Sequence, residues 1–401
     1  MDGSEIGIVR LVKSALTGEK VNISKNFDWD RVIDISRKHQ IISMIYYGTL
    51  NSNIAVPEKI MRALELETLK NIYVSENQLY ELAVIYKAFE DNGIDYAPIK
   101  GAELKSLYPK PEIRSMGDAD ILIKDEQKQK IAEIMSELGF TAGEICDNVI
   151  VWNKNKLLCV ELHTALFPPH NKRYYSCFGT GWNSTELIGN HKYKLVDEDN
   201  FVFLFSHFTK HYSKAGVGIR QLADLWIFLK SKKLSGNDLI NKNINRLGLS
   251  EFYNNICAVM DCWFNGGEEN EKISFISEVI FKNGVFGSYD KFVINSALSS
   301  ANSEISNSKT KFIAIRNLIF LPYTDMCIKY PFLKRVPLLL PFMWIYRLVE
   351  AIIYKKSKIL LHKNDYSILS DNNINEYKDS LKYVGLDFNF KETSYEKSRE
   401  K

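Results

Sequence analysis

The sequence lacks the features that are typical of secreted proteins, membrane-spanning proteins and strongly basic nucleic-acid-binding proteins. It contains no CxxC pair and no regular cysteine framework, which is typical of reduced thiols in a cytosolic protein. The first residues include no long apolar stretch, so we read no signal peptide. The formal net charge of +3 is too small to indicate bulk nucleic acid binding. A cytoplasmic location is therefore expected. The cysteines are Cys146, Cys159, Cys177, Cys257, Cys262 and Cys327.

The composition is that of an ordinary globular protein, with 45% hydrophobic and 25% charged residues. A chain of 401 residues is too long for one ordinary core and predicts two or three subdomains. We expect a helical N-terminal region over residues 1–93, a core with following helices over 94–235, and a helical C-terminal region over 236–390. The last residues, 391–401, predict a disordered tail.

The chain also lacks an uncharged apolar run long enough to cross a bilayer. Residues 336–354 are the most apolar stretch, but Arg347 and Glu350 interrupt it. We favour a buried helix with a solvated stripe. Peripheral contact with the inner face of a membrane is the alternative, because interfacial helices share this composition. The basic residues that flank the stretch are Lys329, Lys334, Arg335, Lys355, Lys356 and Lys358.

The residues that carry chemistry lie in the segment IDYAPIKGAELKSLYPKPEIRSMGDADILI. An apolar run ends in Lys100 and Gly101, and Asp118 and Asp120 open the next apolar run. Side chains at i and i+2 of a strand leave the same face, so the two carboxylates can converge on one cation or bridge two. A glycine lets a phosphate approach the backbone, and an exposed turn lysine beside it can meet the charge. The segment predicts a metal and phosphate site on a small sheet.

Glu161 lies inside a later apolar strand, in the segment VELH. An unpaired buried carboxylate is costly, so Glu161 needs a partner, and the metal site supplies one. His163 shares its face and either lines the same site or is a core histidine with satisfied hydrogen bonds. The loop before Asp118 delivers Arg114 next to the aspartates.

The chain around these residues predicts alternating strands and helices. Asp125 can cap a helix that stops at Gly139. Residues 148–152 and 157–166 predict a hairpin. Residues 167–182 read as a long loop beside the site.

Two helices after the sheet carry further candidates for substrate contact. His207 and His211 lie one helical turn apart on a helix that begins near Asp199, a spacing that suits a metal. Their segment lacks the glutamate of the zinc protease motif, so we expect substrate contact or packing. Arg220 and Asp224 can pair on the next helix, in a structural or a functional role.

Taken together, the segments IKGAELKSLYP, EIRSMGDADILI, VELHTAL and YPFLKRVPLLLPFMWIYRL resemble a family of uncharacterised bacterial nucleotidyltransferases. That family is part of the superfamily that includes DNA polymerase beta and the aminoglycoside nucleotidyltransferases. The resemblance covers most of the chain and implies an α+β fold. Its polymerase-beta-like nucleotidyltransferase core, a small mixed sheet with helices, would be flanked by N- and C-terminal helical regions. Members of the family are often placed in polysaccharide and peptide biosynthesis clusters.

The resemblance also implies roles for single residues. Asp118 and Asp120 would be ligands of two Mg²⁺ or Mn²⁺ ions, and Glu161 would be the third carboxylate. The superfamily usually has Gly-Ser after its first strand, where this chain has Lys100 and Gly101. We carry phosphate binding over to these two positions.

The expected activity is transfer of a nucleoside monophosphate from an NTP to an acceptor hydroxyl, with Lys100, Arg114 and His163 on the nucleotide side. A metal-dependent glycosyltransferase also uses an Asp-x-Asp pair, but there the pair typically ends an apolar strand, whereas here it begins one. A non-catalytic nucleotide-binding or assembly module is the third possibility. The three intact acidic positions argue against it.

Overall fold

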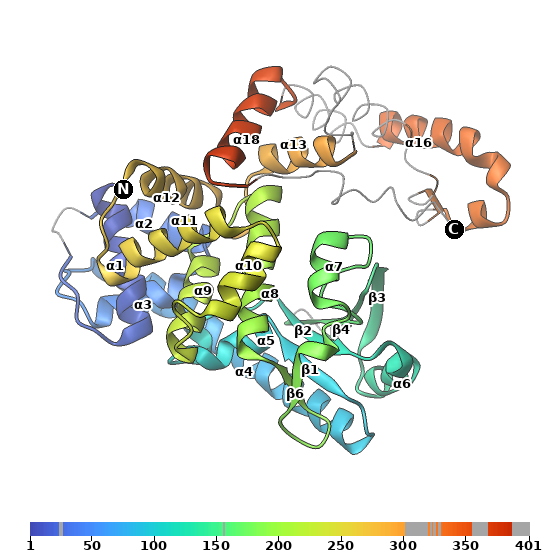
Figure 1. Ribbon diagram of the computed structural model, residues 1–401, viewed down its shortest axis with the longest axis horizontal. Helices are drawn as coiled ribbons and strands as arrows, with labels where there is room; N and C mark the ends of the chain where they lie inside the picture. The colour runs from blue at the N-terminus through green and yellow to red at the C-terminus, as the bar shows by residue number, and fades with distance from the viewer. Residues whose placement is uncertain are drawn as a thin grey trace. The chain divides into compact units, whose positions relative to one another are not determined.

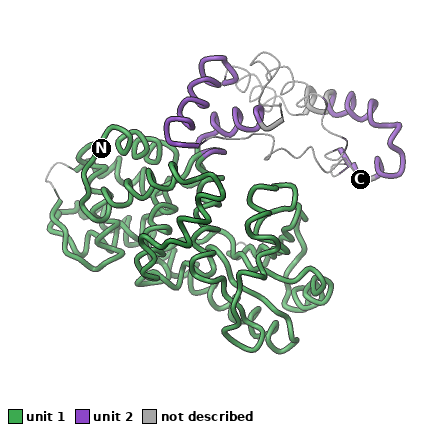
Figure 2. The backbone as a smooth tube through the Cα atoms, viewed as in Figure 1, with its two compact units in different colours: residues 1–212, 216–287 green, residues 213–215, 288–401 purple. Residues whose placement is uncertain are grey.

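The structure, a computed structural model, divides into two compact units (Figure 2). The first unit comprises Met1–Tyr212 and Gly216–Gly287, and the second comprises Ser213–Ala215 and Ser288–Lys401. Residues 236–287, which we grouped with the C-terminal region, therefore belong to the first unit. The predicted tail, 391–401, lies outside the described residues. The structure describes residues 1–23, 27–154, 157–300, 320, 323, 326–327, 330–354 and 368–386.

Helices form the N-terminal part of the first unit, as expected (Figure 1). They are α1 (Gly3–Thr17), α2 (Trp29–Lys38), α3 (Ile42–Leu50) and α4 (Glu58–Asp91). Asp2 and Glu5 form a capping box that starts α1. Helices α1 and α3 approach closely because Gly48 has no side chain, and a Cβ there would overlap the backbone of Leu11.

A mixed five-stranded sheet follows, so the α+β fold class is confirmed. Its strand order is β1-β2-β5-β4-β3, with β2 and β5 parallel and the other neighbours antiparallel. The predicted hairpin is the β4–β5 pair, whereas β3 was not expected because its segment, TAGEIC, has little apolar alternation. The strands are β1 (Tyr96–Ile99), β2 (Asp118–Ile123), β3 (Thr141–Cys146), β4 (Val149–Lys154) and β5 (Leu158–His163), with β6 (Thr185–Leu187) and β7 (Tyr193–Leu195) in a separate pair.

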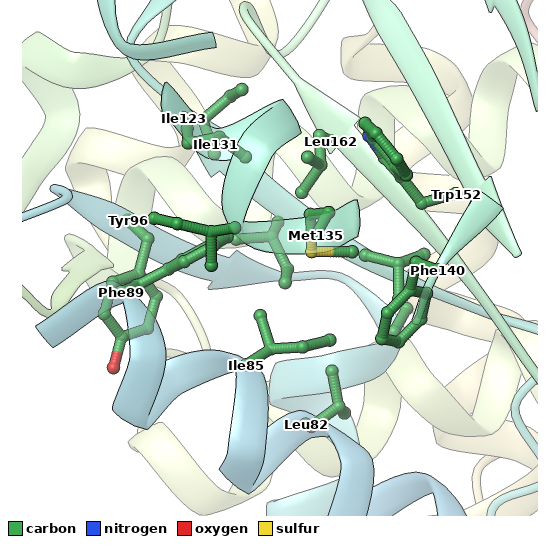
Figure 3. Close-up of a cluster of buried hydrophobic side chains, with 14 of the residues drawn as sticks. Leu82, Ile85, Phe89, Tyr96, Ile123, Ile131, Met135, Phe140, Trp152 and Leu162 are labelled. Carbon is green, nitrogen blue, oxygen red and sulfur yellow. The ribbon is translucent and has the colours of Figure 1, made fainter. Parts of the chain in front are cut away.

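The pleat of β2 and β5 separates the hydrophobic core from the polar face. Helix α4 and helix α6 (Lys128–Glu137) cover one face of the sheet, as Figure 3 shows for Ile85 and Met135. The sheet residues in this core are alternate ones, among them Ile121 and Leu162. Side chains of a strand alternate between faces, so the residues between them point to the opposite side of the sheet.

The segment predicted as a long loop, residues 167–182, contains a helix, and that prediction is wrong. Helix α7 (Lys172–Phe178) forms there because its aromatic residues pack inward. Phe167 stacks on Tyr174 with ring centroids 4.6 Å apart, and Phe178 is also buried. Polar residues alternate with these aromatic residues in the sequence, so no apolar periodicity indicated a helix.

Further helices complete the first unit. They are α5 (Gly101–Leu104), α8 (Asp197–Lys214), α9 (Ile219–Lys232), α10 (Asp238–Arg246), α11 (Ser250–Met260) and α12 (Glu271–Asn283), with short helices η1 (Lys105–Leu107), η2 (Pro111–Ile113), η3 (Asp125–Gln127), η4 (Trp182–Ser184) and η5 (Asp261–Asn265). His39, fully buried at the end of α2, connects two of them. Its Nδ1 accepts from the backbone N–H of Ile219 at 3.0 Å, so its Nε2–H donates to the carbonyl of Phe281 at 3.1 Å.

The second unit contains the apolar segment 336–354, for which we favoured a buried helix. That preference is wrong for the side chains of α16 that the structure describes, since none of them is buried. Met343 and Trp344 pack on a small cluster, whereas Phe342, Ile345, Tyr346 and Val349 are exposed. Described elements of this unit are α13 (Tyr289–Ser300), η6 (Pro331–Lys334), η7 (Pro337–Leu339), α16 (Leu340–Tyr354) and α18 (Asp371–Tyr383). No helix among the described residues is long and apolar enough to span a membrane.

Burial lowers the pKa of His39 to about 4, which makes the first unit sensitive to acid. Since the unfolded chain binds this proton near pH 6.5 and the folded chain only near pH 4, stability should fall as the pH drops between these values. The slope should approach about 1.4 kcal/mol per pH unit. His39→Gln should be less stable at pH 7 but should lack this slope, as measured by urea unfolding at several pH values. Parallel pH profiles in parent and variant would contradict this role.

Candidate metal and nucleotide site

The site lies on the face of the sheet opposite the hydrophobic core. Strands β2 and β5 pair in parallel with Asp118 opposite Cys159 and Asp120 opposite Glu161. This register directs Asp118, Asp120 and Glu161 to one face, although Glu161 follows Asp120 by about forty positions. The structure therefore brings together the three carboxylates that the sequence singles out.

Asp120 is the most connected of the three. Its side chain is buried, and its Oδ1 accepts hydrogen bonds from Lys100 Nζ at 2.7 Å and from His163 Nε2 at 2.8 Å. Burial alone would raise the pKa of Asp120, but Lys100 and His163 hold it well below its usual range. Asp120 is thus ionised at neutral pH despite its burial.

Lys100 is not the exposed turn residue that we expected. Its side chain is 15% exposed and pairs with Asp120, because the register of Ile99 opposite Asp120 directs the next residue toward that carboxylate. Burial would lower the pKa of Lys100, but the nearby carboxylates raise it. Its φ of 46° is rare for a residue with a side chain, and the ion pair helps to offset the strain.

Gly101 follows at the start of α5 in a crowded turn. A Cβ at Gly101 would lie 3.2 Å from Arg114 Nη1 and 3.3 Å from Met116 Cγ. The absence of a side chain therefore lets the turn approach the loop before β2. This close approach is compatible with the predicted phosphate-binding role, which stays a prediction.

Asp118 and Glu161 lie at the open side of the site. Asp118 reaches solvent, yet enough protein surrounds its carboxylate to raise its pKa, with further repulsion from Asp120 and Glu161. The side chain of Glu161 is 28% exposed, so it is not the fully buried carboxylate that we inferred from its apolar strand. Repulsion among three carboxylates favours a bound cation, and oxygen ligands suit Mg²⁺ or Mn²⁺.

The structure also identifies a set of groups close enough to hold one metal ion. Asp120, Glu161 and His163 each offer a ligand atom, and these atoms lie within 4.8 Å of one another. His163 Nε2 lies 2.8 Å from Asp120 and 3.5 Å from Glu161 Oε2. The donor set of this face therefore fits a divalent cation, and His163 lies beside it.

Behind the site lies a buried ion pair that we did not anticipate. Arg114 donates from Nε and Nη2 to the two oxygens of Asp224, at 2.7 and 3.0 Å, and Tyr108 donates to the same carboxylate at 2.6 Å. The predicted pairing of Arg220 with Asp224 is wrong. Arg220 instead donates to Gln40 Oε1 at 2.6 Å and to the carbonyl of Ser115 at 2.7 Å.

Two further charged residues extend this buried layer. Lys105 Nζ donates to the carbonyl of Arg114 at 3.3 Å, and Glu112 accepts from the hydroxyl of Tyr47 at 2.6 Å. Burial, together with the charge of Arg114, lowers the pKa of Lys105 to about 8. Sequence reasoning missed this layer. The only local signal was the charge density of the loop LKSLYPKPEIR.

His207 and His211 lie on α8, with their Nε2 atoms 3.3 Å apart. Burial lowers the pKa of His207 well below its usual value, and the charge of Lys100 lowers it further. His207 is therefore neutral at pH 7. Its predicted contact with substrate stays a prediction.

Comparisons with known proteins bear on this site. A family model described as "Uncharacterised nucleotidyltransferase" matches residues 25–265, which include the whole five-stranded sheet. No curated protein matches the chain. The solved structure of the antibiotic-resistance factor ANT(2'')-Ia aligns with 46% of this chain and 96% of its own, at 11% identity and a TM-score of 0.33. At that score the likeness carries no argument.

Breaking the buried pair of Arg114 and Asp224 by removing one charge should strongly destabilise the fold. Asp224→Asn keeps the shape but leaves the guanidinium charge uncompensated, so the free energy of unfolding should fall by about 3 to 5 kcal/mol. Urea unfolding measures the change. The matched control is Asp91→Asn, which breaks the exposed pair with Lys87 and should cost about 0.5 kcal/mol or less. Equal effects of the two substitutions would show that the buried pair contributes little.

Proposed function

The chain belongs to the Uncharacterised nucleotidyltransferase family, and on that premise we propose that it transfers a nucleoside monophosphate from an NTP to an acceptor hydroxyl. The observation that carries the proposal is the convergence of Asp118, Asp120 and Glu161 on one face of β2 and β5. Nucleotidyl transfer needs position and charge more than covalent help from the protein, and this face supplies both. The proposed cofactor is Mg²⁺ or Mn²⁺, in a two-metal arrangement.

In this proposal the acceptor hydroxyl forms a new bond to the α-phosphorus of the NTP. The bond from that phosphorus to the bridging oxygen of the β-phosphate breaks, and pyrophosphate leaves. Glu161, the carboxylate with partial access to solvent, takes the hydroxyl proton. Bound divalent cations would offset the charge that develops on the phosphates.

The nucleotide side of the site would be formed by Lys100 and Gly101 at the end of β1. Lys100 already meets one carboxylate, so its ammonium lies where a phosphate chelated with the metal would approach. Arg114 would contribute its charge from beneath Gly101 rather than a direct contact, since its guanidinium is committed to Asp224. His207 and His211 would lie on the acceptor side.

We assign Arg220 and Asp224 to bracing rather than to substrate contact. Asp224 already accepts from Arg114 and Tyr108, and Arg220 donates to the backbone of Ser115. Both residues therefore hold the loop that precedes Asp118. The acceptor in our proposal is a sugar or another biosynthetic intermediate, in keeping with a role in polysaccharide biosynthesis.

A screen of the four NTPs for pyrophosphate release, with Mg²⁺ or Mn²⁺ and candidate sugar acceptors, tests the activity. Glu161→Gln should lose at least about 100-fold in turnover. Without metal it should be as stable as the parent or more so, because one repelling charge is gone. Asp118→Asn should reduce turnover at least as far.

The matched control is Glu133→Gln, an exposed residue on α6 at the opposite face of the sheet, which should leave turnover unchanged. Stabilisation by a nucleotide diphosphate sugar, with none by an NTP, would favour the glycosyltransferase. Metal-dependent NTP binding without turnover of any acceptor would favour the non-catalytic module.

We further propose a cytoplasmic protein that contacts an anionic membrane through residues 336–354. Support comes from apolar side chains at helical spacing, which are 46% to 87% exposed: Leu338, Phe342, Ile345, Tyr346 and Val349. Lys334 and Arg335, both exposed, precede them, and the sequence from 330 to 349 contains no acidic residue. An apolar stripe beside cationic groups is typical of interfacial helices.

Flotation with phosphatidylglycerol vesicles at low salt tests this contact. The parent should float with these vesicles and remain below vesicles of neutral lipid. Phe342→Asp should abolish flotation because it places a charge within the apolar stripe. The control Phe286→Asp changes a phenylalanine that is 82% exposed elsewhere and should float like the parent. If the parent fails to float, or if Phe342→Asp has a lower melting temperature, the stripe packs against other parts of the protein and the membrane proposal is wrong.

A further inference from the structure

We propose that His163 is a positioning residue for Asp120 rather than a metal ligand or a nucleotide contact. Its imidazole donates Nε2–H to Asp120 Oδ1 and would leave the other carboxylate oxygen, Oδ2, for the cation. The inference rests on the proposed metal-dependent function. It adds to that function by naming His163 as the residue that orients the carboxylate of Asp120.

The proton on His163 follows from the surroundings of its two ring nitrogens. Nε2 faces two carboxylates, with Asp120 at 2.8 Å and Glu161 at 3.5 Å. A lone pair on Nε2 would be repelled by both, whereas an N–H is attracted by both. The short distance to Asp120 identifies that residue as the acceptor.

Nδ1 supports the same assignment. It is buried and has no hydrogen-bond partner among the described residues. A buried N–H without an acceptor is rarer and more costly than a buried lone pair without a donor. The proton therefore belongs on Nε2. An imidazole that coordinated a metal through Nε2 would have to carry its proton on Nδ1, where no described group accepts it.

Lys100 and His163 both bind the same oxygen of the Asp120 carboxylate and leave the other oxygen without a donor among the described residues. Both donate to the same oxygen of Asp120, Oδ1, from two different strands' ends. Two donors on one oxygen fix the rotation of the carboxylate about its χ2 angle. The second oxygen, Oδ2, accepts from neither donor and would be the atom available to a cation.

Two substitutions of His163 distinguish a hydrogen bond that positions Asp120 from a side chain that only fills space. His163→Gln keeps an N–H donor at a similar reach, whereas His163→Leu keeps the volume without a donor. Probed with Mn²⁺ alone by EPR titration, the Leu variant should bind the ion about 10- to 100-fold more weakly, and the Gln variant within about threefold of the parent. At saturating metal the KM for NTP should change little, while the kcat of the Leu variant should fall. His170→Leu, the same change at a residue beside Asp147 in the β3–β4 turn, is the control.

A spectroscopic measurement on the parent tests metal coordination directly. Pulsed EPR of bound Mn²⁺ detects the ¹⁴N coupling of a coordinated imidazole, and we expect none. A ¹⁴N coupling that ¹⁵N-histidine labelling replaces by a ¹⁵N coupling would come from a coordinated histidine. Its loss in His163→Gln would make His163 that ligand and overturn the proposal. Equal Mn²⁺ affinity of parent and Leu variant, or a Gln variant as impaired as the Leu variant, would also overturn it.

Failure of this inference differs from failure of the proposed function. Metal affinity and ¹⁴N coupling are measured without turnover, so they test His163 even if no NTP is consumed. Normal turnover in His163→Leu would defeat the positioning role while leaving nucleotidyl transfer intact. If the Leu variant does not fold, the labelled parent and the Gln variant still decide between ligand and donor.

Discussion

The carboxylate of Asp120 joins the parts of the chain that form the site. Lys100 reaches it from the end of β1 and His163 from the end of β5, so the strands on both sides of β2 contribute a donor to one oxygen. A buried carboxylate is tolerable only when donors satisfy it, and here two do. Loss of either donor would change both the ionisation and the direction of the group on which the proposed metal binding depends.

The face that presents Asp120 is held from behind by the ion pair of Arg114 with Asp224. This pair connects the loop before β2 to helix α9, and Arg220 connects the same loop to residues near the start of α3. Buried charges contribute little net stability but strongly penalise any arrangement that separates them. The layer therefore restricts the loop to one path, and that path sets where Asp118 begins its strand.

These two sets of contacts explain how one small sheet serves both packing and chemistry. The pleat places apolar side chains against α4 and α6 and polar side chains on the other face, so the core and the site share strands without sharing space. Family membership and the convergent carboxylates together support nucleotidyl transfer. The exposed apolar stripe on η7 and α16 belongs to the other unit and carries a separate role in our proposal.

The sequence by itself determined what depends on local pattern. Apolar runs and their spacing identified β1, β2, β4 and β5, most of the helices, and the shared face of Asp118 and Asp120, because alternation within a strand is a local property. The parallel register of β2 with β5, which adds Glu161 to that face, is a tertiary contact. Only the tertiary structure decided the partners. Arg114 and Asp224 are 110 positions apart. The sequence near Asp224 offers Arg220, four positions earlier on the same helix, as a partner and gives no sign that the distant Arg114 binds instead. Tertiary packing also determined that α7 forms and that α16 is exposed. A sequence pattern shows only which residues are apolar, whereas burial depends on which segments pack together.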